Sequence, residues 1–260
     1  MIGVFDSGVG GLTVVKELRM EMPLQDIVYF GDTARTPYGN KSKEIIRRYA
    51  LEDADFLIKK GANILVVACN TVSSVAYEDL KLKYPNVPIF EVITPAVDRA
   101  IELSRNKRIG VIGTRATINS EIYKNKLESL GAIVKSQECP LFVPFIEEGW
   151  IDKLELKMIV KKYLSKLKKY NLDVLILGCT HYPIIKNIIQ QKIGKKIILI
   201  DSASVTAKRV KSYLDKNLST SQKTSKIKIY FSDLTKQVEK ITYKLIGEDV
   251  DIEQCNNITM

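Results

Sequence analysis

The stretch Asn63-Ile-Leu-Val-Val-Ala-Cys-Asn-Thr71 and its near copy Asp173-Val-Leu-Ile-Leu-Gly-Cys-Thr-His181 indicate how this chain folds. Each is a short apolar run that ends on a cysteine followed by hydrogen-bonding residues. Such runs are typical of buried strands in parallel sheets. We therefore expect Cys69 and Cys179 as exposed thiols at equivalent strand ends. Core packing explains that placement poorly, and two such thiols suggest one reaction carried out from two sides.

Similar β-rich runs recur along the chain and alternate with longer stretches of helical periodicity. The runs are Ile2–Phe5, Ile27–Phe30, Ile64–Ala68, Ile89–Ile93, Ile109–Ile112, Val174–Leu177 and Ile197–Ile200. Alternation of this kind is the pattern of parallel strands joined by crossover helices. The sequence therefore predicts an α/β fold with mainly parallel sheets flanked by helices.

Three separated landmarks repeat in the same order at a nearly constant offset. Ile2-Gly-Val4 recurs as Ile109-Gly-Val111, Cys69 recurs as Cys179, and Ile93-Thr-Pro-Ala-Val97 corresponds to Asp201-Ser-Ala-Ser-Val205. The repeat predicts two similar domains, residues 1–97 and 98–207. Residues 216–227 read as a polar loop, followed by a strand over Ile227–Phe231 and a helix over Leu234–Ile246. We expect this tail, 208–260, to complete the first domain.

Bulk composition describes a globular chain. It has 260 residues, is 45% apolar and carries a formal net charge of +10. The basic residues occupy the polar faces of helical stretches such as Lys157–Lys169, so nucleic acid is not the expected partner. Neither a signal peptide nor a membrane-spanning run is evident, which predicts a soluble cytoplasmic protein without membrane contact. Four scattered cysteines fit a reducing compartment.

Polar and reactive residues gather where the predicted strands end, and open α/β sheets bind ligands outside those carboxyl ends. They are Asp6-Ser7, Gly31-Asp32, Cys69-Asn70-Thr71, Thr114 and Cys179-Thr180-His181. Two domains that face each other through these edges would place the two cysteines on opposite walls of one cleft. Each cysteine precedes an expected helix, whose N-terminus would lower its pKa. His181, the only histidine, and Asp6 are the groups that could orient or deprotonate a thiol.

Other interpretations of these residues stay open. Gly8, Gly10 and Gly11 could serve a tight turn or bind an anion through their amides. A dinucleotide site would need a third glycine where Thr13 stands, and Asp6-Ser7 would put an acid beside the pyrophosphate. A metal site made of Cys69, Cys179 and His181 would lack an obvious fourth ligand. Cys139 and Cys255 have no such neighbours, and we expect them to be structural.

Several motifs together resemble the bacterial glutamate racemases of the aspartate/glutamate racemase family. They are Phe5-Asp-Ser-Gly-Val-Gly-Gly11, Pro37-Tyr-Gly39, Ala68-Cys-Asn-Thr71, Phe142-Val-Pro144 with Glu147, and Gly178-Cys-Thr-His-Tyr-Pro183. The resemblance extends from residue 2 to about residue 207. It implies a cofactor-independent isomerase that interconverts L- and D-glutamate and supplies D-glutamate for peptidoglycan, and hence for cell wall biogenesis and cell shape.

The resemblance also implies roles for individual residues. Cys69 and Cys179 would be the catalytic acid and base, supported by Asp6, Glu147 and His181, with no metal. Substrate would be held by Asp6, Ser7, Tyr38, Gly39, Asn70, Thr71, Thr180 and His181. Inverting an α-carbon requires removing a proton from one face and returning one to the other, so a single base must relocate or two must flank the carbon. Two cysteines from two domains meet that need. Two alternatives stay open for the function: a racemase of another amino acid such as aspartate, and a non-catalytic amino-acid-binding protein. A homodimer is a possible assembly.

Overall fold

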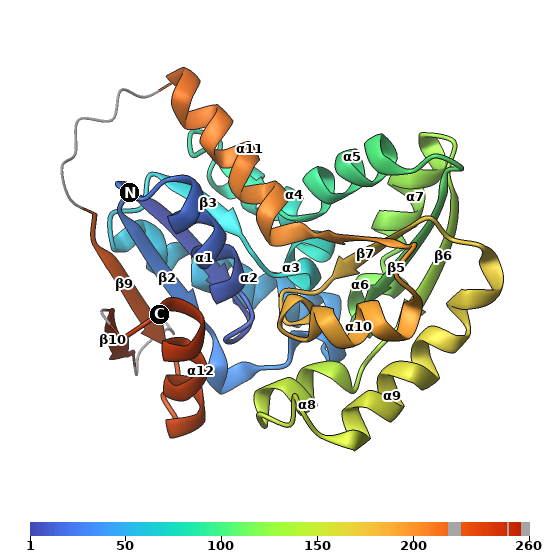
Figure 1. Ribbon diagram of the computed structural model, residues 1–260. Coiled ribbons are helices and arrows are strands. Elements are labelled where there is room, and N and C mark those ends of the chain that lie inside the picture. The colour runs from blue at the N-terminus through green and yellow to red at the C-terminus, as the bar shows by residue number, and fades with distance from the viewer. Residues whose placement is uncertain (218–224, 249, 256–260) are drawn as a thin grey trace.

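Two α/β domains lie side by side in the computed structural model, which describes residues 1–217, 225–248 and 250–255 (Figure 1). In this part of the chain the first sheet has the strand order β10-β9-β2-β1-β3-β4 and the second β6-β5-β7-β8. All pairs of neighbouring strands described in these sheets are parallel. The predicted fold of two similar domains with parallel sheets flanked by helices is therefore confirmed.

The strands of the first sheet are β1 (Ile2–Asp6), β2 (Ile27–Gly31), β3 (Ile64–Val67), β4 (Ile89–Glu91), β9 (Ile227–Phe231) and β10 (Asp251–Gln254). Those of the second are β5 (Arg108–Gly113), β6 (Ile133–Glu138), β7 (Val174–Gly178) and β8 (Ile198–Asp201). The central strands β1, β2, β3 and β7 are buried along their whole length. Helices cover both faces of such strands, which is why their sequences read as continuous apolar runs.

The helices connect these strands and pack on the sheets. The α-helices are α1 (Leu12–Glu21), α2 (Lys43–Lys59), α3 (Asn70–Val75), α4 (Tyr77–Lys83), α5 (Ile93–Leu103), α6 (Arg115–Asn119), α7 (Ile122–Ser129), α8 (Phe142–Glu147), α9 (Leu154–Ser165), α10 (Lys186–Ile193), α11 (Ser202–Asn217) and α12 (Lys236–Ile246). Short 3-10 turns are η1 (Thr33–Arg35), η2 (Tyr38–Asn40), η3 (Leu167–Tyr170) and η4 (Tyr182–Ile185). No helix in the described ranges is long and apolar enough to cross a membrane.

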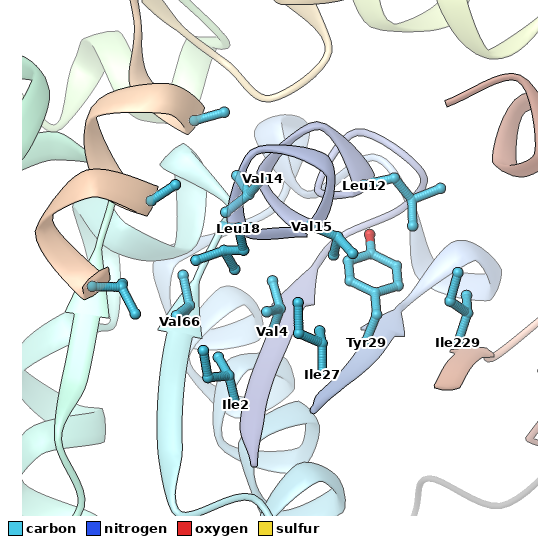
Figure 2. Close-up of a cluster of buried hydrophobic side chains, with 14 of the residues drawn as sticks. Ile2, Val4, Leu12, Val14, Val15, Leu18, Ile27, Tyr29, Val66 and Ile229 are labelled. Carbon is cyan, nitrogen blue, oxygen red and sulfur yellow. The ribbon is translucent and has the colours of Figure 1, made fainter. Parts of the chain in front are cut away.

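One of the two hydrophobic cores of the first domain lies between α1 and the sheet (Figure 2). The helix buries Leu12, Val14, Val15 and Leu18. These side chains meet strand residues such as Val4, Ile27 and Val66. Each fully buried aliphatic side chain stabilises the fold by about 1.5–3 kcal/mol relative to exposure. This packing holds the turn between β1 and α1, and so holds the end of β1 where Asp6 lies.

The internal repeat is visible in the topology. The order β2-β1-β3-β4 in the first sheet matches β6-β5-β7-β8 in the second, so β3 and β7, which lead into the two cysteines, are equivalent strands. Strand β6, the counterpart of β2, was not predicted. It is a partly exposed edge strand of mixed polarity, Ile133-Val-Lys-Ser-Gln-Glu138, and has no apolar run to detect.

The predicted strand over Ile89–Ile93 is too long. It ends at Glu91, because the Glu91 carboxylate accepts the main-chain N–H groups of Ile93 and of Thr94 (2.8 Å) and so caps the start of α5.

The tail returns to the first domain: β9 pairs with β2, β10 pairs with β9, and α12 packs on α1. Of the loop predicted over 216–227, residues 216 and 217 belong to α11 and residues 218–224 lie outside the described ranges. The domain bounds at 97 and 207 stay predictions. Helices α5 and α11 run unbroken across them and contact each other.

Candidate functional site

The polar strand ends of both domains meet at one junction. Asp6 is the last residue of β1, Cys69 follows β3, and Cys179 directly follows β7. Thr180 Oγ1 donates to Asp6 Oδ1 at 3.2 Å, and Thr13 Oγ1 donates to the Thr180 carbonyl at 3.1 Å. The strand ends predicted to face each other are therefore in direct contact across the two domains.

Both thiols are buried, whereas the sequence led us to expect exposed ones. Cys69 and Cys179 are each 5% exposed. The exposed-thiol expectation is wrong because loops from both domains close over the strand ends. Gly10 is one example: a Cβ atom there would lie 2.5 Å from Thr180 Oγ1. In this arrangement both sulfurs are largely shielded from solvent.

Cys69 lies at the N-terminal end of α3, with its sulfur 3.7 Å from Ser7 Oγ. Burial raises the pKa of this thiol and the negative charge of Asp6 raises it further, while the Val72 N–H and Ser7 act in the opposite direction. The expectation that the helix would lower this pKa is wrong for Cys69, because desolvation of a thiolate outweighs a few N–H dipoles.

Cys179 begins a chain of contacts that continues through the only histidine. Its sulfur lies 3.8 Å from His181 Nδ1, and His181 Nε2 lies 3.1 Å from Glu147 Oε1. Burial alone would lower the pKa of His181. Hydrogen bonds to Cys179 and Glu147 outweigh that effect and raise the His181 pKa well above its usual 6.5. The arrangement can hold an imidazolium between a thiol and a carboxylate, and it is Glu147 of the Glu147-Glu148 pair that makes this contact.

The glycine-rich turn after β1 wraps around the Asp6 carboxylate. Asp6 Oδ2 accepts the N–H groups of Gly8 (3.2 Å) and Gly11 (3.0 Å). These two amides are therefore engaged by the chain's own carboxylate, which favours the tight-turn interpretation and weakens the dinucleotide alternative. Burial raises the pKa of Asp6 even though His181 and these N–H groups favour its charged form.

Asn70 and Thr71 line the same junction. Tyr123 of the second domain donates its hydroxyl to Asn70 Oδ1 at 2.7 Å. Thr71 Oγ1 lies 3.0 Å from Thr114 Oγ1 and 3.5 Å from Thr117 Oγ1. Thr117 and Tyr123 were not predicted to lie here. The only feature of the sequence that could have indicated them is that they follow soon after Thr114, at the end of a predicted strand.

Gly39 lies against Thr114, beside the threonines of the junction. The neighbouring Tyr38 hydroxyl instead contacts two aspartates of the first domain. It contacts Asp32 and lies 3.1 Å from Asp53 Oδ2. Burial and these two carboxylates raise the pKa of the Tyr38 phenol. Any contact between Tyr38 and a ligand therefore has to come from its main chain. Gly39 packs closely on the second domain, since a Cβ there would come within 2.6 Å of Thr114 Cβ.

Arg35 and Asp53, which hold this segment, were missed from the sequence. Arg35 lies 2.6 Å from Asp32 Oδ2 and 3.1 Å from Asp53 Oδ1, and also contacts Glu52. Asp53 itself could have indicated this network, because it is a carboxylate on the apolar face of α2, among buried residues. A charge in that position needs a partner.

The other two cysteines were expected to be structural. Cys139 is fully buried in the core of the second domain, and Cys255 is half-buried after β10. Among the residues that the structure describes, no group of three or more His, Cys, Asp or Glu side chains could hold a metal ion.

Fold and site together define a two-domain α/β protein whose duplicated halves each bring one cysteine to a shared junction. The model of the family Asp/Glu/Hydantoin racemase matches residues 14–210, and the chain belongs to this family.

Within this family, the chain is similar to several glutamate racemases. The chain is 48% identical to a glutamate racemase of Aquifex aeolicus over 250 residues, 96% of this chain and 95% of that one. A crystal structure of a glutamate racemase isoform from Bacillus anthracis aligns with a TM-score of 0.93 at 34% identity, covering 98% and 97% of the two chains. The Francisella tularensis glutamate racemase in complex with D-glutamate aligns with a TM-score of 0.90 at 37% identity, covering 98% and 96%. The resemblance noted from the motifs is confirmed, and with it an isomerase of the racemase type.

Proposed function

We propose that this protein interconverts L- and D-glutamate by transferring a proton at the α-carbon between Cys69 and Cys179. The observation that carries the proposal is the pair of buried thiols, one from each half of a duplicated fold, at one junction. The choice of glutamate is supported by the relatives, one of which was crystallised with D-glutamate.

The reaction needs the two sulfurs in complementary states. One thiolate removes the α-proton and becomes a thiol. The opposite thiol then gives its proton to the other face of the carbon and becomes a thiolate, so charge and protons balance. The roles exchange when the reaction runs in the other direction.

Forming the thiolate is the task we assign to the neighbouring acid–base groups. Asp6 carries a raised pKa, which makes it a stronger proton acceptor than an ordinary aspartate and suits it to take the proton of Cys69. His181 lies within reach of the Cys179 sulfur, and Glu147 fixes its far nitrogen. Asp6 therefore serves Cys69 of the first domain, and His181 together with Glu147 serves Cys179 of the second.

The remaining polar groups bind the substrate and stabilise the charge that develops on it. We assign this role to the side chains of Ser7, Asn70, Thr71 and Thr180 and to the main chain at Tyr38 and Gly39. Donors that are already oriented in a site closed to water stabilise a carbanion more effectively than mobile water does. Because the thiols are buried, domain opening would admit substrate and closure would assemble the site.

Exchange of the α-hydrogen in heavy water tests this function directly. Purified protein, dialysed against a chelator and free of added cofactor, is incubated with L- or D-glutamate. We expect deuterium at Cα together with the opposite enantiomer. Glutamate that binds but neither exchanges nor inverts would favour the amino-acid-binding alternative. Faster inversion of aspartate than of glutamate in the same assay would reassign the substrate.

The cellular setting stays a prediction as well. We infer a cytoplasmic enzyme that supplies D-glutamate for peptidoglycan, and a homodimer is the assembly to test by light scattering. A D-glutamate requirement for growth after loss of the gene is the expected phenotype.

A further inference from the structure

The Asn70 side chain is held from one side only. Its Oδ1 accepts the Tyr123 hydroxyl at 2.7 Å, and both residues are 2% exposed. Its Nδ2 is buried and has no hydrogen-bond partner among the described residues. A primary amide nitrogen carries two N–H donors, and leaving both unpaired away from water is unfavourable. The amide therefore has donors available for an acceptor in the site.

Tyr123 contacts both cysteine-bearing segments. It lies on α7 of the second domain, whereas Asn70 directly follows Cys69 in the first. Its ring also packs on the residue before Cys179, since a Cβ at Gly178 would be 3.3 Å from Tyr123 Cε2. Burial raises the pKa of Tyr123 well above 10, so its hydroxyl keeps its proton and donates it. The bond to Asn70 thus crosses the domain junction.

We propose that Tyr123 is a positioning residue for substrate binding: its hydroxyl holds the Asn70 amide oxygen and thereby turns the amide nitrogen toward a carboxylate of the bound amino acid. Because the bond joins the two domains, the amide takes this orientation only when the domains are closed. The inference rests on the proposed function, in which Asn70 binds substrate.

Tyr123→Phe removes the hydroxyl and keeps the ring. We expect KM to rise about tenfold for both enantiomers while kcat falls by a smaller factor, because the thiols are untouched and the Asn70 amide is still present. Tyr77→Phe is the matched control, because Tyr77 begins α4 and its hydroxyl donates at 3.3 Å to the Ile89 carbonyl of β4, within the first domain. The control should leave KM unchanged. An unchanged KM in Tyr123→Phe would overturn the inference.

A double-mutant cycle with Asn70→Ala separates positioning from a structural role. If Tyr123 acts through Asn70, Tyr123→Phe should change KM by less than about twofold once Asn70 is alanine. An additional tenfold change in that background would show that Tyr123 acts by another route.

The wild-type protein offers a test that survives a poorly folding variant. The side-chain NH2 signals of Asn70, identified by their loss in Asn70→Ala, should shift in 15N NMR spectra when D-glutamate is added. Signals unmoved at saturating D-glutamate would contradict the inference. Failure of the proposed function looks different, because the wild-type protein would then not racemise glutamate at all.

Discussion

Gly10 and His181 touch each other across the two domains. A Cβ atom at position 10 would come within 2.4 Å of His181 Nδ1, closer than such atoms can approach. Gly10 belongs to the turn after β1, and His181 follows β7. The absence of one side chain in the first domain therefore allows the histidine of the second to lie beside Cys179.

Gly10→Ala should disable the site without unfolding the chain. The added methyl group must push His181 aside or hold the domains apart. A misplacement of about 1 Å in a catalytic group can cost about 100-fold in rate, so we expect kcat/KM to fall by at least that factor. Racemisation followed by circular dichroism measures the loss, and the far-UV spectrum checks the fold. Activity close to wild type would mean that this contact does not limit closure.

Cys69→Ala and Cys179→Ala should each abolish racemisation. Losing one of two acid–base groups costs about 100- to 10,000-fold, and here inversion needs both. Cys139→Ala is the matched control. Its thiol is fully buried and donates to the Gln137 carbonyl at 3.7 Å, so the variant should lose some stability and keep kcat. Full activity in either of the first two variants would exclude the two-base mechanism.

Glu147→Gln should lower the pKa of His181 toward 6.5. The carboxylate is one of the two contacts that hold this pKa up, and a neutral amide cannot replace its charge. The chain contains a single histidine, so its imidazole Cε1 proton can be followed without ambiguity in an NMR titration. A midpoint that does not move between wild type and variant would contradict the assignment of Glu147.

The raised pKa of His181 also makes its contribution to the stability of the fold depend on pH. The folded pKa of His181 lies above the unfolded value near 6.5, so its contribution to stability is full below pH 6.5. That contribution is lost as the pH rises through the folded pKa. The stability advantage of wild type over Glu147→Gln should therefore shrink on the alkaline side, which urea unfolding at several pH values would measure.

Arg35→Met should destabilise the fold by about 3–5 kcal/mol at neutral pH, because it leaves buried carboxylates without their counter-ion. Asp32 and Asp53 are both fully buried. Burial already raises the pKa of Asp53 and Arg35 opposes that rise, so the variant should recover stability as acid protonates the aspartate. Urea unfolding at pH 7.5 and pH 5 measures the difference.

Arg48→Met is the control for this variant. Arg48 is exposed and lies 3.8 Å from Glu52, so its loss should cost less than about 1 kcal/mol. Equal destabilisation of the two variants would show that the buried network contributes no more than a surface ion pair. KM should rise in Arg35→Met alone, since Arg35 holds the segment that carries Tyr38 and Gly39.

Local sequence patterns predicted the central strands, because a strand buried on both faces must be apolar along its length. The same patterns failed for β6, whose partly exposed edge position imposes no such requirement. They also predicted β4 two residues too long, because the Glu91 side chain caps α5 and so ends the strand. Motifs located Cys69, Cys179 and Glu147, but nothing local to Tyr123 or Arg35 marked them as neighbours of the site.

The sequence by itself predicted two similarly built α/β halves with a cysteine after an equivalent strand in each, and its motifs pointed to the family. Only the tertiary structure decided that the thiols are buried, that the Cys69 pKa is raised rather than lowered, and that Asp6 meets Thr180 and Asn70 meets Tyr123. The apolar run that predicts a buried strand can be read from consecutive residues of the chain. Burial and hydrogen bonding across the junction depend on segments 53 and 174 residues apart, which become neighbours only when the two domains pack.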